Sequence, residues 1–516
     1  MKNKAKSLMF LGTGSDVGKS VLAAAFCRIF KQDGFRVAPF KAQNMALNSY
    51  ITPEGGEMGR AQVVQAEAAG IEPHVDMNPV LLKPTSQMGS QVIVRGKAVG
   101  NLSARDYYAY KTRLIPVVRE CYQRLAEQYD LVVLEGAGSA VELNLKAHGI
   151  VNLARAEMAD ARCILVGDID RGGIFAALLG SYMLMTPEEQ GRILGFMVNK
   201  LRGDPALFTS GIEILEARSS RPVLGVIPHY SHIALQEEDS VALQRRMRQN
   251  TGALPSESAL AVGVVRLPFI SNYTDFDCFE QEPGVNLLYF ERPAEVFHFD
   301  AVILPGSKNT LEDLEFLKKS GLSDAILAFA KSGGTVVGLC GGYQMMGLRV
   351  QDPHGVESSL REVGGLGLLD METEMYPEKI TSQVEALPAV ENHWAASMDS
   401  PLGGYEIHMG RSVSLGAARS LFRIVRRDGG KVNLLEGLTQ ADGRVWGTYI
   451  HGIFDNDAFR RSFLQEVQRR SGKAAVTGSP TFSYREWKET QYDLLAEHVR
   501  RHTDMKRIYR EMGIAV

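Results

Sequence analysis

The chain has 516 residues, of which 45% are hydrophobic and 23% charged, and its formal net charge is −3. This length predicts about two to four domains, and the composition is that of a globular protein with a sizeable core. The nearly balanced charge argues against a protein that binds nucleic acid through a general excess of basic residues.

The chain has five cysteines, which are scattered and form no C-x-x-C pair. This pattern excludes a zinc ribbon or a thioredoxin motif and fits a reducing compartment. The apolar run near the N-terminus is too short for a signal peptide, and the longest weakly polar run, 172–185, is too short to span a bilayer. We therefore expect a cytoplasmic protein without a membrane span.

The first predicted elements are a strand over Ser7–Gly12, a glycine-rich turn and a helix over Val21–Phe26. From Thr13 the turn fits the pattern G-x-x-x-x-G-K-[ST], with threonine in place of the first glycine. Inward-turned N–H groups and the helix N-terminus can bind phosphates, Lys19 can reach the outer phosphates, and the Ser20 hydroxyl can bind Mg²⁺. This variant resembles the loop of dethiobiotin synthetase-like and MinD-like ATPases. The predicted ATP-binding residues of the loop are Thr13, Gly14, Ser15, Asp16, Val17, Gly18, Lys19 and Ser20.

Short apolar runs alternate with helical patterns through the first half, which predicts a parallel α/β sheet. The predicted strands are Ser7–Gly12, Arg36–Lys41, Leu131–Glu135, Cys163–Asp168, Ile193–Asn199 and Val223–Ile227. Polar residues follow several of them, at the strand ends where ligands of such sheets bind. Residues 53–100 lack clear periodicity, and we expect long, ordered, functional loops there.

The polar stretch 236–258 predicts a linker, and a second α/β pattern follows it. Its predicted strands are Leu260–Val265, Val285–Phe290, Ala301–Leu304, Thr335–Leu339 and Val445–Ile450. The tail contains one amphipathic helix, Trp487–Met512. We therefore predict a phosphate-loop domain over 1–235, a linker over 236–258, a second domain over 259–471 and a helical tail over 472–516.

Cys340 follows the strand Thr335–Leu339 within Gly-Leu-Cys-Gly-Gly, which predicts a nucleophile on a tight strand-to-helix turn. The helix N-terminus stabilises a thiolate there. The N–H groups of Gly306 and Gly341 can form an oxyanion hole, and His451, at another strand end, can serve as the base. His408 is a rival base, although its glycine-arginine neighbours favour a contact with substrate or a domain interface.

Pro305-Gly-Ser307, Gly338-Leu-Cys-Gly-Gly342 and the late His451 resemble the class I glutamine amidotransferase domain. Most of that class has a glutamate two residues after the histidine, where this chain has Ile453. The resemblance is thus to the branch, including cobalamin-pathway enzymes, that works with a Cys–His dyad. What orients His451 is left open, with Asp455 as a weak candidate.

Four strings in the first half resemble the cobyric acid synthase family: Pro39–Met45, Gly59–Gln62, Pro73–Pro79 and Leu82–Thr85; a fifth is Val166–Gly173. The resemblance implies a P-loop domain joined to an amidotransferase domain. It also implies amidation of the b, d, e and g carboxylates of adenosylcobyrinic acid a,c-diamide with ATP, Mg²⁺ and glutamine. Ammonia would be lost in water, so a protected path between the sites is expected.

The same resemblance implies roles for strand-end residues of the first half. The implied metal ligands are Ser20, Glu135 and Asp168; Asn199 is implied to contact adenine; and the implied substrate residues are Lys41, Gln43, Asn44 and Asn48. For Glu135 and Asp168 a solvated strand-end carboxylate is the alternative, and for Asn44 and Asn48 it is turn formation.

Two other interpretations remain at this stage. One is the sister amidotransferase that makes the a,c-diamide, which shares the two-domain plan. The other is a MinD-like ATPase switch with an inactive amidotransferase domain, against which the presence of both Cys340 and His451 argues.

Overall fold

The computed structural model describes residues 5–86, 89–144, 150–236, 259–390, 394–397, 400–416, 418–473 and 482–515. Contacts divide the chain into two compact units. Where they are described, Met1–Ala46, Glu57–Gln236 and Lys488–Val516 form the first unit, and Leu47–Gly56 with Glu237–Trp487 form the second. The segment Leu47–Gly56 thus belongs to the second unit although it lies within the first half of the sequence. Beyond residue 236, the predicted linker lies outside the described residues.

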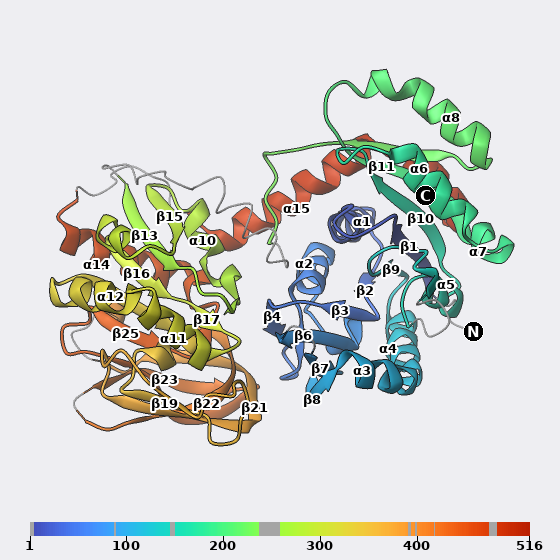
Figure 1. The fold of residues 1–516 in the computed structure, drawn as a ribbon. Coiled ribbons are helices and arrows are strands. Elements are labelled where there is room, and N and C mark those ends of the chain that lie inside the picture. The colour runs from blue at the N-terminus through green and yellow to red at the C-terminus, as the bar shows by residue number, and fades with distance from the viewer. Residues whose placement is uncertain are drawn as a thin grey trace. The chain divides into compact units, whose positions relative to one another are not determined.

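Six parallel strands form the main sheet of the first unit, in the order β12-β11-β10-β1-β9-β2 (Figure 1). No residue of β2 or β9 is exposed, as expected for parallel strands covered on both faces. The six predicted strands are all present, and the predicted α/β fold is confirmed. The strands are β1 (Lys6–Gly12), β2 (Val37–Phe40), β9 (Leu131–Glu135), β10 (Arg162–Asp168), β11 (Ile193–Leu201) and β12 (Val223–Pro228).

Helices and short strands complete the first unit. The helices are α1 (Lys19–Gln32), α2 (Arg60–Ala69), α3 (Ala104–Tyr110), α4 (Leu114–Gln128), α5 (Leu153–Met158), α6 (Ile174–Met183), α7 (Pro187–Arg192) and α8 (Thr209–Ser219). A smaller sheet has the order β3-β6-β7-β8. The short strands are β3 (Gln43–Met45), β5 (Glu57–Gly59), β6 (Val80–Ser86), β7 (Gly89–Val94) and β8 (Lys97–Ser103).

The prediction of long loops over 53–100 is therefore wrong. The stretch contains the helix α2 and most of the smaller sheet. Nine of the ten α2 residues are buried, among them Gln62 and Gln65 with no exposed surface. A helix that is buried on nearly every side has no solvent-exposed face, so its sequence lacks the hydrophobic period of an amphipathic helix.

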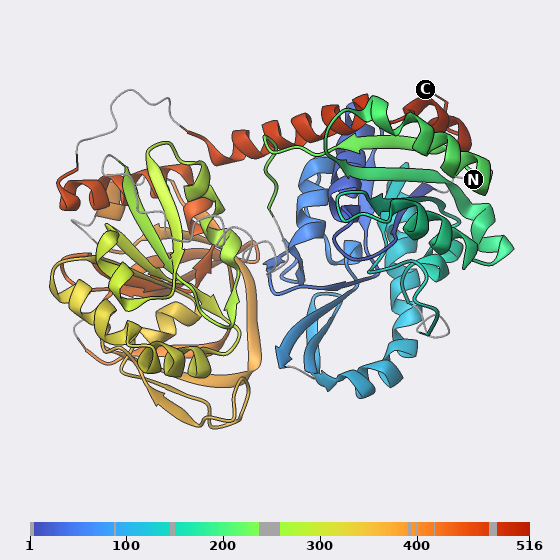
Figure 2. The same cartoon turned by 45° about the horizontal axis from the view of Figure 1, so that its top comes forward.

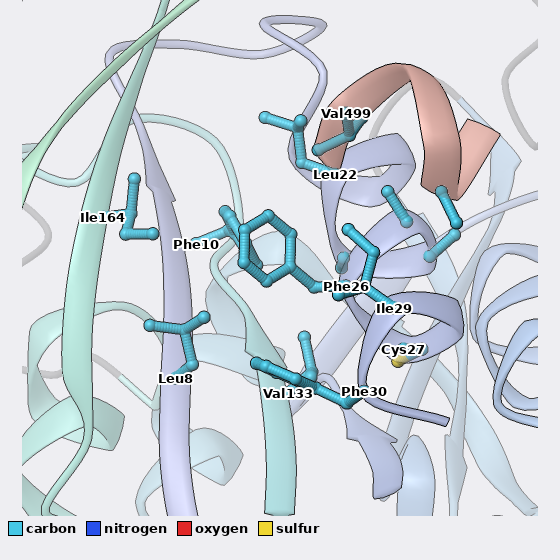
Figure 3. Packing of buried hydrophobic residues seen from close by; sticks show 14 of the residues in the cluster. Leu8, Phe10, Leu22, Phe26, Cys27, Ile29, Phe30, Val133, Ile164 and Val499 are labelled. Carbon is cyan, nitrogen blue, oxygen red and sulfur yellow. The ribbon is translucent and has the colours of Figure 1, made fainter. Parts of the chain in front are cut away.

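The core of the first unit packs α1 against the sheet (Figure 3). The Phe10 and Phe26 rings meet edge to face with centroids 4.9 Å apart. Val499 and Ile508, near the C-terminus, belong to the same buried cluster. The end of the chain, drawn red in Figures 1 and 2, is thus part of this core.

The predicted single helix Trp487–Met512 is two helices, α15 (Tyr484–Arg501) and α16 (Met505–Met512). The chain breaks between them because Thr503 bridges to Gly225 and the Asp504 N–H donates to the Leu224 carbonyl, 2.8 Å away. The Asp504 carboxylate then caps α16 by accepting from the Arg507 N–H.

The sheet of the second unit has the order β15-β13-β16-β18-β25-β24-β23-β21-β19-β20, with β22 pairing with β21 and β26. It begins with parallel strands and continues with antiparallel pairs, except that β19 and β21 are parallel. The parallel strands are those predicted: β13 (Leu260–Val265), β15 (Val285–Phe290), β16 (Ala301–Leu304), β18 (Thr335–Leu339) and β25 (Val445–Thr448). The other strands of the second unit are β14 (Ile270–Ser271), β17 (Gly306–Ser307), β19 (Arg349–Gln351), β20 (Glu362–Gly364), β21 (Met371–Pro388), β22 (Leu402–Ser414), β23 (Arg419–Arg427), β24 (Gly430–Thr439), β26 (Ile450–His451) and, from the first half of the sequence, β4 (Ser49–Ile51).

Helices cover both faces of the parallel strands in the second unit. Val336 belongs to the buried cluster that contains α11 and α12, drawn yellow in Figure 2, whereas the next residue, Val337, belongs to the cluster that contains α14. The alternation is that of a strand covered on two sides. The helices are α10 (Asp277–Gln281), α11 (Thr310–Lys319), α12 (Leu322–Lys331), α13 (Gly341–Met345) and α14 (Asp457–Ser471). Among the described residues, no helix is both long and apolar enough to cross a membrane.

We predict that Ile508→Ala destabilises the first unit. Ile508 has no exposed surface and packs in the core beside α1, so the change leaves a cavity worth about 2–5 kcal/mol of unfolding free energy. Urea unfolding followed by circular dichroism measures the loss. The exposed Lys506→Ala on the same helix is the control and should unfold like the unaltered chain; equal midpoints for both variants would contradict the packing role.

Candidate functional site

The glycine-rich turn lies between β1 and α1, as predicted. Gly18 has a φ of 101°, and a Cβ there would lie 2.1 Å from Nδ2 of Asn199, so only glycine fits. Lys19 donates through Nζ to the carbonyls of Gly14 at 2.7 Å and Gly138 at 3.0 Å. The turn thus has the strand-to-helix geometry, the lysine and the helix N-terminus that bind phosphates.

Glu135 lies at the end of β9 beside this turn. Its Oε1 accepts from the Ser20 hydroxyl and from Nζ of Lys41, both at 2.7 Å, and its Oε2 accepts from Nε2 of Gln65 at 2.6 Å. Burial by itself raises the pKa of Glu135, but the Lys41 charge and the hydrogen bonds outweigh it and lower the pKa. Glu135 is therefore a carboxylate held against the loop serine, while Gln65, which the sequence analysis missed, orients its second oxygen.

Asp168 has different partners. Its Oδ2 lies 2.8 Å from Nζ of Lys200, which also donates to the carbonyl of Asp16. Nδ2 of Asn199 donates to the carbonyl of Val17 at 2.9 Å. These contacts hold the phosphate loop from its other side. The adenine role of Asn199 and the metal role of Asp168 stay predictions.

The four predicted substrate residues are not all in one unit. Lys41 pairs with Glu135, Gln43 accepts from the Tyr107 hydroxyl at 2.6 Å, and Asn44 donates to Gln62 at 2.9 Å, all within the first unit. Asn48 is fully buried and belongs to the second unit. Their substrate roles stay predictions.

Cys340 stands between β18 and α13 with φ 51° and ψ −109°, the strained backbone of a nucleophile on a tight turn. Its glycine neighbours make the turn possible, because a Cβ on Gly342 would lie 2.0 Å from the Leu304 carbonyl oxygen and one on Gly338 would lie 2.7 Å from Cα of Tyr343. The Cys340 thiol lies 3.6 Å from the carbonyl oxygen of Ile407.

His451 is buried beside Cys340, and its Nδ1 lies 2.6 Å from Oδ2 of Asp275. Burial by itself lowers the pKa of His451, but the Asp275 charge, the hydrogen bond to Asp275 and the interaction with Cys340 raise it to about 10. The ring is therefore held as an imidazolium that can stabilise a Cys340 thiolate and donate a proton.

The carboxylate that orients His451 is thus Asp275, and the weak candidate Asp455 is wrong in this role. Oδ1 of Asp275 also accepts from the Gly452 N–H at 2.9 Å. Asp275 lies on a short 3-10 helix, Tyr273–Phe276, after β13 and β14. The sequence does offer a signal for it, since Ser271, Asn272 and Asp275 are polar residues that follow a buried parallel strand.

The predicted oxyanion residues lie at this site. Gly306 pairs with Ser271 across β14 and β17, and a Cβ on Gly306 would lie 3.6 Å from Cε1 of His451. A Cβ on Gly341 would lie 2.8 Å from the backbone N of Ser307. The two glycine segments are therefore neighbours beside the histidine, and their oxyanion role stays a prediction.

The rival base His408 is occupied elsewhere. Its Nδ1 lies 2.7 Å from the carbonyl oxygen of Gly410, and its ring stacks on Tyr449 with centroids 3.7 Å apart. His451, with Asp275 behind it, is the histidine that interacts with the Cys340 thiol.

We predict that Asp275→Asn slows the alkylation of Cys340 by iodoacetamide at about pH 7. Asp275 orients the His451 ring and holds its pKa up, so the loss of the carboxylate lowers the pKa of His451 and loosens the ring beside the Cys340 thiol. A decrease of about tenfold is expected, as for the loss of one hydrogen bond between charged groups. Peptide mass spectrometry identifies the alkylated residue.

Asp455→Asn is the matched control and should leave the rate unchanged. A slower reaction in Asp455→Asn, with Asp275→Asn unaffected, would show that the orienting carboxylate has been assigned to the wrong residue.

Comparison with known proteins agrees with this geometry. Residues 8–241 match the CobQ/CobB/MinD/ParA nucleotide binding domain, and residues 261–459 match the CobB/CobQ-like glutamine amidotransferase domain. The chain is 72% identical to a cobyric acid synthase of Syntrophobacter fumaroxidans over 514 residues, covering 100% of both chains. It is 50% identical to a cobyric acid synthase of Yersinia enterocolitica over 511 residues, covering 98% of each. The chain therefore belongs to the cobyric acid synthase family.

Proposed function

We propose that the chain amidates the b, d, e and g carboxylates of adenosylcobyrinic acid a,c-diamide to give adenosylcobyric acid, with ammonia from glutamine. The main support for the proposal is that this chain is 72% identical, over its full length, to a cobyric acid synthase. The same chain combines a phosphate loop with a Cys340–His451–Asp275 site. The relatives are cobyric acid synthases, which favours this reaction over synthesis of the a,c-diamide. A cytoplasmic location fits it.

Glutamine hydrolysis is assigned to the second unit. The Cys340 thiolate attacks the side-chain amide, and the N–H groups of Gly306 and Gly341 are the candidate donors to the oxyanion. The His451 imidazolium gives its proton to the amide nitrogen, which leaves as ammonia, while Asp275 keeps the ring oriented. Water then hydrolyses the thioester on Cys340, which releases glutamate and frees the thiol. A complete Cys–His–Asp arrangement argues against a switch protein with an inactive amidotransferase domain.

Activation of the carboxylate is assigned to the first unit. ATP, with Mg²⁺ on its phosphates, supplies the phosphoryl group that makes the carboxylate reactive. The residues present fit both: the α1 N-terminus and Lys19 would hold the phosphates, and the Ser20 hydroxyl and the Glu135 carboxylate, 2.7 Å apart, would offer oxygen ligands to Mg²⁺. Lys41, which donates to Glu135 in this structure, would exchange that contact for the incoming carboxylate.

The deciding experiment incubates the protein with adenosylcobyrinic acid a,c-diamide, Mg-ATP and glutamine, with products followed by mass spectrometry. Four successive amidations are expected. In Cys340→Ala, the glutamine-dependent reaction should fall by at least about 10³-fold because the nucleophile is lost, whereas ammonium salt should support amidation as before. Unchanged substrate with both nitrogen sources, while ATP and glutamine are still consumed, would overturn the corrin assignment.

We predict further that Glu135→Gln reduces ammonium-dependent amidation by about 100-fold or more and raises the Mg²⁺ concentration needed, because a metal-facing charge is lost. Asp168→Asn is the comparison, and its effect should be smaller because the loop hydroxyl of Ser20, the other candidate metal ligand, contacts Glu135. Glu135→Asp, which keeps the charge, guards against a folding defect and should retain more activity. If Glu135→Gln and the unaltered chain need the same Mg²⁺ concentration, Glu135 is not a metal ligand.

A further inference from the structure

The segment Leu47–Gly56, called the strap below, packs in the glutaminase unit although it follows the nucleotide unit's segment Lys41–Ala46 in sequence. Its residues Asn48, Ser49, Ile51 and Thr52 have no exposed surface. The strap contains the short strand β4 and a turn in which the Thr52 N–H donates to the Gly56 carbonyl. Its other backbone groups need partners too, and several of these partners belong to β21, β22 and Asn272.

Three hydrogen bonds anchor the strap to β21 and β22. The Tyr405 hydroxyl donates to the Ser49 carbonyl at 3.2 Å, and Oγ1 of Thr381 donates to the Gly55 carbonyl at 3.0 Å. Nε2 of Gln383 donates to the Ile51 carbonyl. Ile51 also packs in a small apolar cluster with Tyr405 and Ile407. The strap is therefore fixed at both ends and in the middle.

One path from the strap to His451 passes through Asn272. The Ser49 N–H donates to Oδ1 of Asn272 at 3.3 Å, and Nδ2 of the same amide lies 3.4 Å and 3.5 Å from Nδ1 and Nε2 of His451. Asn272 has φ 51° and accepts, through its carbonyl, from the N–H of Asp275 at 3.1 Å. It thus contacts the strap, the catalytic ring and the turn that carries the orienting carboxylate.

A second path passes through aromatic rings. The Tyr50 ring meets the Tyr405 ring with centroids 5.0 Å apart, and Tyr405 stacks on His451 at 5.3 Å with an angle of 19° between planes. Tyr405 and His451 are also direct partners across β22 and β26. A displacement of the strap would therefore move a ring that lies flat against the catalytic imidazole.

We propose that the strap Leu47–Gly56 positions His451 for glutamine cleavage through Asn272 and Tyr405, and thereby makes ammonia release depend on the segment Lys41–Ala46 that precedes it. This rests on the proposed function, since that segment carries Lys41, which pairs with Glu135 in the ligase site. Only residues 42–48, which include the strand β3, separate Lys41 from Ser49 in the chain. Asn272 and Tyr405 are positioning residues in this scheme.

Two variants cut the two paths separately. Tyr405→Phe removes the hydroxyl that holds Ser49 but keeps the ring on His451. Asn272→Gly removes the amide but keeps a residue that tolerates a φ of 51°. Pro53→Ala is the matched control, because Pro53 is an exposed residue of the same strap.

Glutaminase kcat and KM are measured for each protein with glutamine alone and again with Mg-ATP and adenosylcobyrinic acid a,c-diamide. In the unaltered chain and in Pro53→Ala, the second condition should raise kcat. In Tyr405→Phe and Asn272→Gly, the stimulated kcat should fall about five- to tenfold, as expected for loss of one hydrogen bond, with little change in KM for glutamine. A loss of glutamine binding, or a general folding defect, would move KM or the melting temperature instead.

Stimulated kcat values equal to that of the unaltered chain in both variants would overturn the inference. So would an unaltered chain whose glutaminase does not respond to the ligase substrates. Ammonium-dependent amidation, run alongside, keeps the two proposals apart. If it proceeds in every protein while the strap variants behave normally, the function stands and the strap role fails; if it is absent even in the unaltered chain, the proposed function fails.

Discussion

The glutaminase half depends on one buried contact, the short hydrogen bond between Nδ1 of His451 and Oδ2 of Asp275. Both side chains are at most 3% exposed, so two charges have left water at a cost of several kcal/mol each. The cost is offset because both Asp275 oxygens are satisfied, the second by the Gly452 N–H. The contact holds only while the turn after β14 and the end of β26 keep their register.

The nucleotide half places its own charges by the same rule. Glu135 ends β9 as His451 ends β26, and both lie where strands stop and neighbouring loops supply donors. An ionised group that is buried at a strand end must be paired. Lys41 and Ser20 therefore contact Glu135, just as Asp275 contacts His451. Such pairs leave reactive groups charged, oriented and screened from bulk water.

The parallel strands and the nucleophile turn could be predicted because their signals are local. Strands such as β9 are apolar throughout, and the phosphate loop and Cys340 are marked by glycines at fixed spacing. The role of Asp275 could not be predicted because its partner His451 is 176 residues away in the sequence. The helix α2 could not be predicted because it is buried on nearly all sides, so its sequence lacks the hydrophobic period of an amphipathic helix. The antiparallel strands β19–β24 carry no comparable local signal, since their stability comes from pairing across the sheet. The sequence of Leu47–Gly56 contains no local pattern that predicts its packing in the second unit.

β22 connects these observations. Tyr405 on this strand touches the strap and His451, and two residues later the Ile407 carbonyl lies 3.6 Å from the Cys340 thiol while its side chain packs on Ile51. Residues two apart in a strand have side chains on the same face, so one face of β22 meets the strap and the base, while the Ile407 backbone carbonyl contacts the nucleophile. Close packing leaves no room for the strap to move without β22 responding. The geometry of the Cys340–His451 pair is therefore set partly by ten residues that lie, in sequence, inside the nucleotide half.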